Sequence, residues 1–252
     1  MNTKPIVMML SYARSGGTLL NRCLASLPNT LMLSEVNIEA LCPNSCSHIK
    51  DQAKDWYGLD LRSDGFLENI EELYNYCLET DRTLIIRDWS FGSFVPSRYN
   101  NFNPSKKLAT FEAIAKRFPV TPFALVRDSV DIWLSFNASP RTFYDKNLEF
   151  LYEFSKELIA NNIKIFRYED FCRDSEAVMR DICNYTGINY SDEFKGFSNY
   201  FKVTGDIDLP EHSRGIQVGK ISLLSRRESY NEFAEVIENN TKASLINQLF
   251  GY

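Results

Sequence analysis

Residues 8–20 constrain the fold of this chain more than any other stretch. An apolar run of the kind that forms a buried strand leads into a short polar loop, and leucines at helical spacing follow the loop. The loop reads Arg14-Ser15-Gly16-Gly17-Thr18. The first turn of a helix has amide groups without partners and a partial positive charge, and glycines let a ligand approach the backbone closely. The stretch therefore predicts an anion site, with an ordinary strand-turn-helix as the open alternative.

Composition is that of a globular protein. The 252 residues suffice for one large α/β domain or two small ones, and 44% hydrophobic and 24% charged residues are ordinary proportions. The net charge of −5 argues against general nucleic-acid binding, which needs an extended basic face. The sequence shows neither an apolar stretch of membrane-spanning length nor a secretion signal. We therefore expect a cytoplasmic protein with no membrane or nucleic-acid partner.

The six cysteines are expected to stay mostly reduced in that compartment. Cys42, Cys46 and His48 lie close enough in the sequence to suggest a metal ion. No second pair of ligands follows them at the spacing of a zinc site. We therefore expect these cysteines to lie in a loop or in the core, and we predict no metal ion.

Strands and helices alternate along the chain. Continuous apolar runs predict strands at residues 6–10, 30–34, 83–86, 122–126 and 163–168. Apolar residues at helical spacing predict helices at residues 18–27, 66–78, 106–117, 128–137, 144–161 and 174–186. Residues 36–63 and 91–104 are irregular and predict long loops, the first with room for one helix. The alternation predicts a single three-layer α/β domain over residues 1–252, with a central parallel sheet covered by helices on both faces.

Charged residues stand where several predicted strands end. Arg14, Arg87 and Arg127 each follow a strand, and Glu35 follows a fourth. Ligands bind such sheets outside the carboxyl ends of the strands. Although one arginine after a strand is common on any surface, the shared position of three at one edge predicts an anion-binding site there.

Three segments resemble, in family order, the motifs of the sulfotransferases that use 3′-phosphoadenosine 5′-phosphosulfate (PAPS). Residues 12–20 are similar to their 5′-phosphosulfate loop, usually Pro-(Lys or Arg)-Ser-Gly-(Thr or Ser)-Thr. Residues 127–135 are similar to their 3′-phosphate motif, in which a serine follows an arginine by eight positions. Residues 168–171 resemble their Tyr-Glu-Asp-Leu segment. The motifs look closest to the bacterial, tyrosylprotein and trehalose-type branches.

The resemblance implies a P-loop-like fold, PAPS as the sulfuryl donor and 3′,5′-ADP (PAP) as a product. It implies that the 5′-phosphosulfate lies on Arg14, Ser15, Gly16, Gly17, Thr18 and Leu19. Arg127 and Ser135 would bind the 3′-phosphate. Arg214 or Arg226 is predicted to close over that phosphate, with a solvated surface charge as the alternative.

Four positions depart from the family pattern. Ser139 stands where many relatives have another basic residue, and Arg141 is a candidate to supply that charge. Gly17 replaces the usual threonine or serine, and Ser129 replaces a proline. Arg87 stands where the family often has a lysine.

Transfer of a sulfuryl group needs cations at the leaving phosphate and a base for the acceptor's proton. Arg14 is the first candidate cation and Arg87 the second. Glu35 is the predicted base, because it follows the second strand, as the glutamate base does in the tyrosylprotein and trehalose-type branches. Asp88 is the second candidate base, with a structural Arg87–Asp88 pair as its alternative. His48 and His212 stay open.

The predicted acceptor is a small molecule. Glu39, Asp88 and the acidic composition would tolerate a cationic natural product. Transfer to nitrogen is as open as transfer to oxygen. The apolar walls of the acceptor site are predicted to be Trp56, Trp89, Phe91, Phe94 and Tyr99, unless these aromatics only pack in the core. A monomer or a homodimer is expected.

Two other functions stay open. The chain could bind a PAPS-like nucleotide without catalysis, or it could be a kinase-like phosphoryl transferase. No lysine follows Gly16 or Gly17, which argues against ATP hydrolysis.

Overall fold

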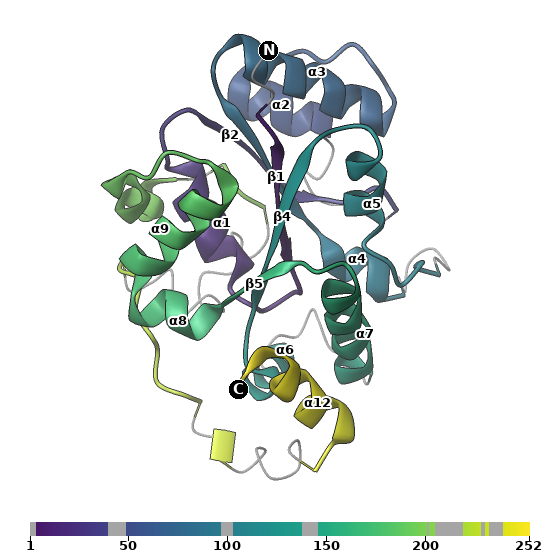
Figure 1. The fold of residues 1–252 in the computed structure, drawn as a ribbon, viewed down its shortest axis with the longest axis vertical. Helices are drawn as coiled ribbons and strands as arrows, with labels where there is room; N and C mark the ends of the chain where they lie inside the picture. Colours follow the sequence, from purple (N-terminus) through teal and green to yellow (C-terminus); the bar gives the residue numbers. More distant parts are fainter. Residues whose placement is uncertain are drawn as a thin grey trace.

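The strands form one parallel sheet in the computed structural model, which describes residues 4–39, 49–96, 103–137, 146–200, 202–204, 219–227, 230–231 and 239–252. Within these residues the sheet has the strand order β2-β3-β1-β4-β5 (Figure 1). The strands are β1 (Ile6–Ser11), β2 (Thr30–Val36), β3 (Thr83–Asp88), β4 (Val120–Val126) and β5 (Lys164–Arg167). Because β1 is central, its carboxyl end lies between those of β3 and β4.

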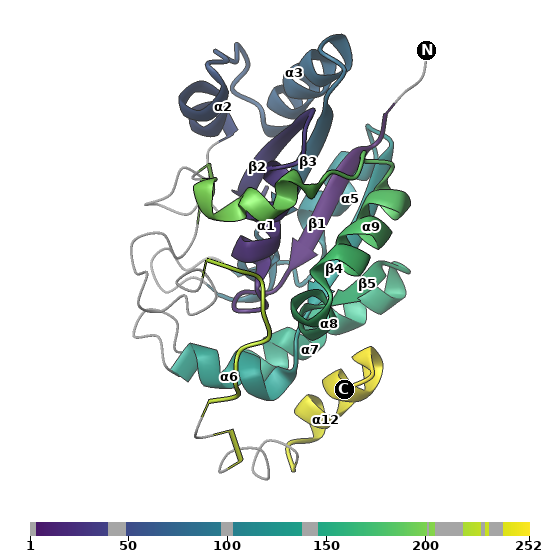
Figure 2. The ribbon, with the colours of Figure 1, turned by 90° about the vertical axis from the view of Figure 1, so that its left-hand side faces the viewer.

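Helices cover both faces of the sheet. The helical elements are α1 (Gly17–Ala25), α2 (Ile49–Tyr57), α3 (Phe66–Glu79), α4 (Ser90–Phe94), α5 (Ala109–Ala115), α6 (Ser129–Asn137), α7 (Asn147–Ala160), α8 (Tyr168–Arg173), α9 (Ser175–Thr186), the 3₁₀ helix η1 (Asp192–Asn199) and α12 (Thr241–Phe250). Figures 1 and 2 show α1, α8 and α9 on one face, and α4, α5 and α7 on the other.

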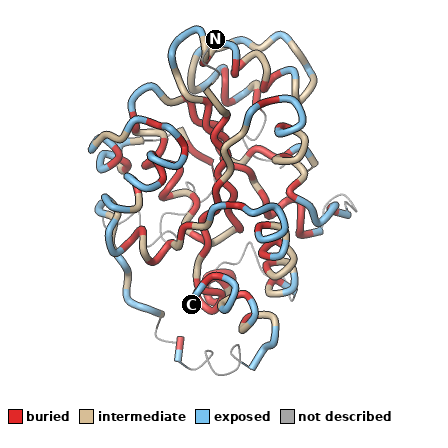
Figure 3. Tube along the Cα trace, in the orientation of Figure 1, coloured by how far each residue is buried: buried red, intermediate tan, exposed pale blue. Residues whose placement is uncertain are grey.

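The core divides into two layers because alternate residues of a strand point to opposite faces. Met8 and Leu10 of β1 pack with α3, α4, α5 and α7. Val7 and Met9 pack with α1, α8, α9 and η1. All six residues of β1 are buried, which explains its continuous apolar run. Figure 3 shows this buried centre along the strands. The predicted three-layer α/β fold is therefore confirmed.

Some predicted elements differ from the observed ones. Residues 91–104 were predicted to be a loop, but α4 begins at Ser90 and uses the aromatic side chains of that segment to fill the core. The predicted helix at residues 106–117 is confined to α5. Glu35 lies inside β2, at a shift in its register with β3, instead of following the strand.

A search of the described residues for a helix long and apolar enough to cross a membrane finds none.

Candidate active site

The loop between β1 and α1 has the geometry that its sequence predicts for binding an anion. Arg14 (φ 71°) and Gly16 (φ 90°) both adopt left-handed backbone conformations. Ser15 is buried, and its backbone N–H and its hydroxyl both donate to the Tyr12 carbonyl, at 3.3 and 2.6 Å. Gly16 is the N-cap of α1 and offers no side chain to cap it. The first-turn amides of α1 therefore have no cap inside the helix and face outward from its N-terminus.

Tyr168, the first residue of α8, packs against this loop. A Cβ atom at Gly16 would overlap the Tyr168 ring. The same ring lies under the Arg127 guanidinium, whose Cζ is 4.8 Å from the ring centroid. Tyr168 belongs to the third sequence motif, from which no role for its side chain follows. Only the packing of α8 against the loop shows that one aromatic ring contacts both predicted anion-binding segments.

Arg87 and Glu35 form a nearly buried ion pair at the carboxyl ends of β3 and β2. Arg87 Nη2 lies 3.0 Å from Glu35 Oε1, and their side chains are only 8% and 18% exposed. Nε and Nη1 of Arg87 are buried and have no hydrogen-bond partner in the structure. Two nitrogens of the Arg87 guanidinium thus have no partner, while the third holds the carboxylate of Glu35.

The Arg87 guanidinium also explains the departure at Gly17. A Cβ atom at position 17 would lie 3.2 Å from both Nε and Nη2 of Arg87, and 2.6 Å from Ser11 Oγ. A threonine or serine at position 17 would therefore crowd the guanidinium. The glycine and the bulky arginine fit together where the resembled family often combines a hydroxyl residue with a lysine.

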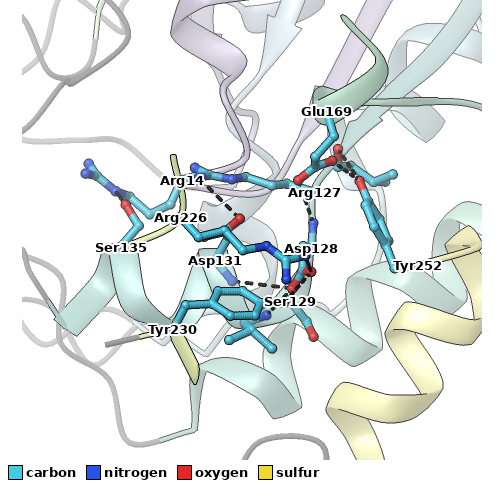
Figure 4. Close-up of polar contacts among 12 residues, drawn as sticks. Arg14, Arg127, Asp128, Ser129, Asp131, Ser135, Glu169, Arg226, Tyr230 and Tyr252 are labelled. Atoms are coloured by element: carbon cyan, nitrogen blue, oxygen red, sulfur yellow. Dashed lines mark hydrogen bonds and ion pairs between the residues drawn. The ribbon is translucent and has the colours of Figure 1, made fainter. Parts of the chain in front are cut away.

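Arg14, Arg127 and Ser135 are also brought together (Figure 4). Arg14 Nε donates to Ser135 Oγ at 2.9 Å, across 121 residues of sequence. Arg127 Nη1 donates to the Arg14 carbonyl at 3.1 Å, and Arg127 Nη2 lies 3.8 Å from Asp131. Arg127 Nε is buried without a hydrogen-bond partner. The first loop is thus linked directly to α6, which carries the second predicted motif.

Asp88 has a different environment from Glu35, although both were candidate bases. It is 1% exposed, and its carboxylate accepts from Ser90 Oγ at 2.9 Å and from Asn37 Nδ2 at 3.3 Å. Burial raises the pKa of Asp88 to about 6, and hydrogen bonds from Ser90, Thr110 and Asn37 oppose that rise. The carboxylate that the structure places on Arg87 is that of Glu35, not that of Asp88.

Arg226 lies beside the start of α6. Its Nη2 is 3.6 Å from Asp128 Oδ2, and its Cζ lies 3.8 Å from the Tyr230 ring centroid. Tyr230 donates its hydroxyl to the same Asp128 oxygen at 2.9 Å. Asp128 Oδ1 caps α6 by accepting from Val130 N at 2.8 Å. Arg226 therefore pairs with a helix-capping carboxylate next to Arg127.

Several candidate residues lie outside the described ranges. They are Arg141, Arg214, Cys42, Cys46, His48, His212 and Tyr99. Among the residues that are described, no group of three or more His, Cys, Asp or Glu side chains could hold a metal ion.

One protein-family model matches most of the chain. The family model described as "Sulfotransferase family" matches residues 5–192, which include the first loop, both arginine-bearing strand ends and the segment at Tyr168. The chain belongs to the sulfotransferase family. The resemblance noted in the sequence is therefore confirmed at the level of the family.

Two solved structures are similar to this sulfotransferase over nearly its full length. The sulfotransferase domain from the Synechococcus PCC 7002 olefin synthase aligns with a TM-score of 0.61 and 18% identity, covering 93% of this chain and 94% of the other. The sulfotransferase domain from the curacin biosynthetic pathway aligns with a TM-score of 0.60 and 14% identity, covering 98% of each chain. Both alignments support the fold. No curated protein matches the sequence.

Two of the aromatic residues predicted to line the acceptor site of this sulfotransferase instead pack in its core. Phe91 and Phe94 are buried, and their rings lie 5.3 Å from Tyr12 and 5.5 Å from Phe154, respectively. Trp89 is partly buried and packs against Phe91. These contacts match the packing alternative that the sequence left open for the same residues.

Proposed function

We propose that this sulfotransferase transfers the sulfuryl group of PAPS to a hydroxyl or amine nitrogen of a small molecule. The observation that carries the proposal is the set of unpaired donors: Nε and Nη1 of Arg87 and Nε of Arg127 are buried without hydrogen-bond partners. Unpaired buried donors of this kind are costly unless a ligand or water accepts from them. Arg87 lies at the carboxyl end of β3 and Arg127 directly follows β4. Both strands neighbour β1, so the two arginines suit a donor with two anionic ends.

The 5′-phosphosulfate would lie on the first-turn amides of α1, within reach of Arg87. The guanidinium would neutralise the charge that builds up on the leaving phosphate, and Arg14 would add a second positive charge beside the loop. The 3′-phosphate would be held by Arg127 and Ser135. Arg14 already donates to Ser135, so the two ends of the donor site share a hydrogen bond. Ser15, Gly16, Gly17, Thr18 and Leu19 would complete the phosphosulfate loop.

Glu35 would act as the base. The acceptor's oxygen or nitrogen attacks sulfur, the bond from sulfur to the phosphate oxygen breaks, and the acceptor's proton passes to the Glu35 carboxylate. Sulfated acceptor and PAP leave. The partly exposed Glu35 can be reached by an acceptor, whereas the oxygens of Asp88 already accept hydrogen bonds in the core. The Arg87 contact would hold the Glu35 carboxylate beside the leaving phosphate that Arg87 neutralises.

The two similar domains and the acidic composition support one class of acceptor. The two similar domains come from an olefin synthase and from the curacin biosynthetic pathway. We therefore expect an intermediate of natural-product biosynthesis, with cationic acceptors tolerated because of the acidic composition. Asp88 would not contribute to that tolerance, since it is buried away from solvent.

Calorimetry with PAP and with ATP tests the donor. PAP should bind tightly without Mg²⁺, and Arg127→Ala should weaken its binding about 10- to 100-fold, as loss of charge-assisted hydrogen bonds predicts. Arg173→Ala is the matched control, because Arg173 is an exposed arginine that pairs with Asp170 on the surface of α8. Binding of ATP alone, dependent on Mg²⁺, would overturn the proposal in favour of phosphoryl transfer. Binding of PAP without product from labelled PAPS, across a panel of acceptors, would favour a non-catalytic protein.

Paired variants test the base. Glu35→Gln should lower kcat at least 100-fold with PAPS affinity retained, because the amide cannot take the acceptor's proton. Asp88→Asn should lower kcat no more than a few fold. If Glu35→Gln keeps nearly full turnover while Asp88→Asn abolishes it, the two assignments are reversed.

A further inference from the structure

Arg127 stands just beyond the end of its strand, where the sheet does not hold it. The ladder between β4 and β5 ends with the pair Val126 and Arg167, and the ladder between β1 and β4 ends at Leu125. The main chain at Arg127 must therefore be fixed by other contacts if its guanidinium is to meet a phosphate in a defined place.

Two side chains contact the peptide groups on either side of Arg127. The Tyr252 hydroxyl lies 3.3 Å from the carbonyl oxygen of Val126, and the backbone amide of Asp128 donates to Glu169 Oε1 at 3.2 Å. The Tyr252 hydroxyl also hydrogen-bonds to Glu169 Oε2. Figure 4 shows Glu169 and Tyr252 on one side of the Arg127 main chain.

We propose that Glu169 and Tyr252 are positioning residues that hold the main chain on both sides of Arg127 and thereby set the affinity for the donor's 3′-phosphate. The proposal rests on the proposed function, because it assumes that Arg127 binds that phosphate. Neither residue touches the donor; both act through Arg127.

The buried position of Glu169 would be costly in free energy if its carboxylate lacked hydrogen-bond partners. Glu169 is buried, and burial of a carboxylate is unfavourable unless both oxygens are hydrogen-bonded. Here one oxygen accepts from the Asp128 amide and the other from Tyr252. The preceding residue, Tyr168, stacks under the Arg127 guanidinium. Two consecutive residues of α8 thus fix both the side chain and the main chain of Arg127.

Contacts other than the Tyr252 hydroxyl also hold α12 and the C-terminal residues against the rest of the protein. The hydroxyl can therefore be removed without detaching α12. Arg167 Nη1 donates to the Gly251 carbonyl at 2.7 Å, and the Ser129 amide donates to Asn247 Oδ1 at 3.1 Å. The Arg167 guanidinium also lies 5.7 Å from the Tyr252 ring centroid. Tyr252→Phe keeps all three contacts and removes only the hydroxyl, whose one proton is shared between Glu169 Oε2 and the Val126 carbonyl oxygen.

The experiment compares two ligands that differ only in the 3′-phosphate, PAP and 5′-AMP, by calorimetry on the full chain. Tyr252→Phe should weaken PAP binding about five- to tenfold and leave 5′-AMP binding unchanged. The KM for PAPS should rise by the same factor while kcat stays constant. Tyr185→Phe is the matched control, since the Tyr185 hydroxyl donates to the Pro122 carbonyl on the same strand, at its other end, at 3.0 Å. This control should change the affinity for neither PAP nor 5′-AMP.

Glu169→Gln provides a second measurement should Tyr252→Phe fold poorly. Its amide oxygen can still accept from Asp128, so the loss of PAP affinity should be smaller than in Glu169→Ala. If wild type does not prefer PAP to 5′-AMP, the proposed donor fails. If wild type prefers PAP and the Tyr252 and Glu169 variants keep that full preference, or lose both ligands equally, the positioning role is overturned while the donor assignment stands.

Discussion

At the scale of single residues, the two carboxylates at the edge of the sheet have opposite surroundings. Glu35 has a left-handed backbone (φ 53°) at the register shift of β2, which turns its side chain onto Arg87. Asp88 is enclosed and satisfied by neutral donors, among them Asn37, whose Nδ2 also donates to Ser93 Oγ at 2.9 Å. Asp88 therefore joins β2, β3 and α4, whereas the Glu35 carboxylate is partly exposed beside Arg87.

This assignment predicts how stability changes with pH. Folding raises the pKa of Asp88 from 3.8 to about 6, so between these values the native state holds a proton that the unfolded state has lost. The free energy of unfolding should therefore fall as pH rises from about 4 to about 6, by roughly 3 kcal/mol from this group. In Asp88→Asn that contribution should be absent.

Urea denaturation of wild type and Asp88→Asn at pH 4.5 and pH 7.5 measures the effect. The difference in unfolding free energy between the two proteins should shift in favour of the variant at the higher pH. A difference independent of pH would contradict the raised pKa.

At the scale of elements, β1, its loop and α1 form one unit whose conformation depends on contacts from α8 and β3. Gly16 needs both a left-handed backbone and the space that the Tyr168 ring occupies beside it. Gly17 needs the space next to Arg87. The loop is therefore shaped as much by its neighbours as by its own glycines.

Gly16→Ala should destabilise the protein by about 2–5 kcal/mol, because the left-handed backbone costs roughly 1–2 kcal/mol and overlap with a packed ring adds a similar or larger amount. Gly187→Ala is the control: Gly187 ends α9 with φ 76° but has open space around its would-be Cβ. It should lose only about 1–2 kcal/mol. Thermal or urea unfolding gives both values, and equal losses would show that Tyr168 does not restrict the loop.

At the scale of the whole molecule, the fold concentrates positive charge in an acidic protein. The net charge is −5, yet Arg14 and Arg127 follow β1 and β4, and Arg87 is the penultimate residue of the adjacent strand β3. The parallel sheet places these strand ends at one edge, and the packing of α8 and α12 there supplies Tyr168, Glu169 and Tyr252. The proposed anion site thus draws on residues from position 14 to position 252.

The sequence alone was sufficient to predict the alternation of strands and helices, the three-layer fold and the loop at Arg14, because apolar periodicity and glycine spacing are local properties. It also indicated the sulfotransferase family, since the motif residues stand at fixed separations. The sequence predicted a loop where α4 lies, because the helical conformation of its aromatic residues depends on packing against α7.

Only the tertiary structure determined which polar groups lie in contact. Glu35, and not Asp88, pairs with Arg87, and Arg14 donates to Ser135. Arg226 pairs with Asp128, and the Tyr252 hydroxyl lies beside the Val126 carbonyl. These pairings join residues far apart in the chain, and no local pattern encodes them. Their geometry follows from strand order, from a register shift and from the docking of helices, all of which are set by packing of the complete core.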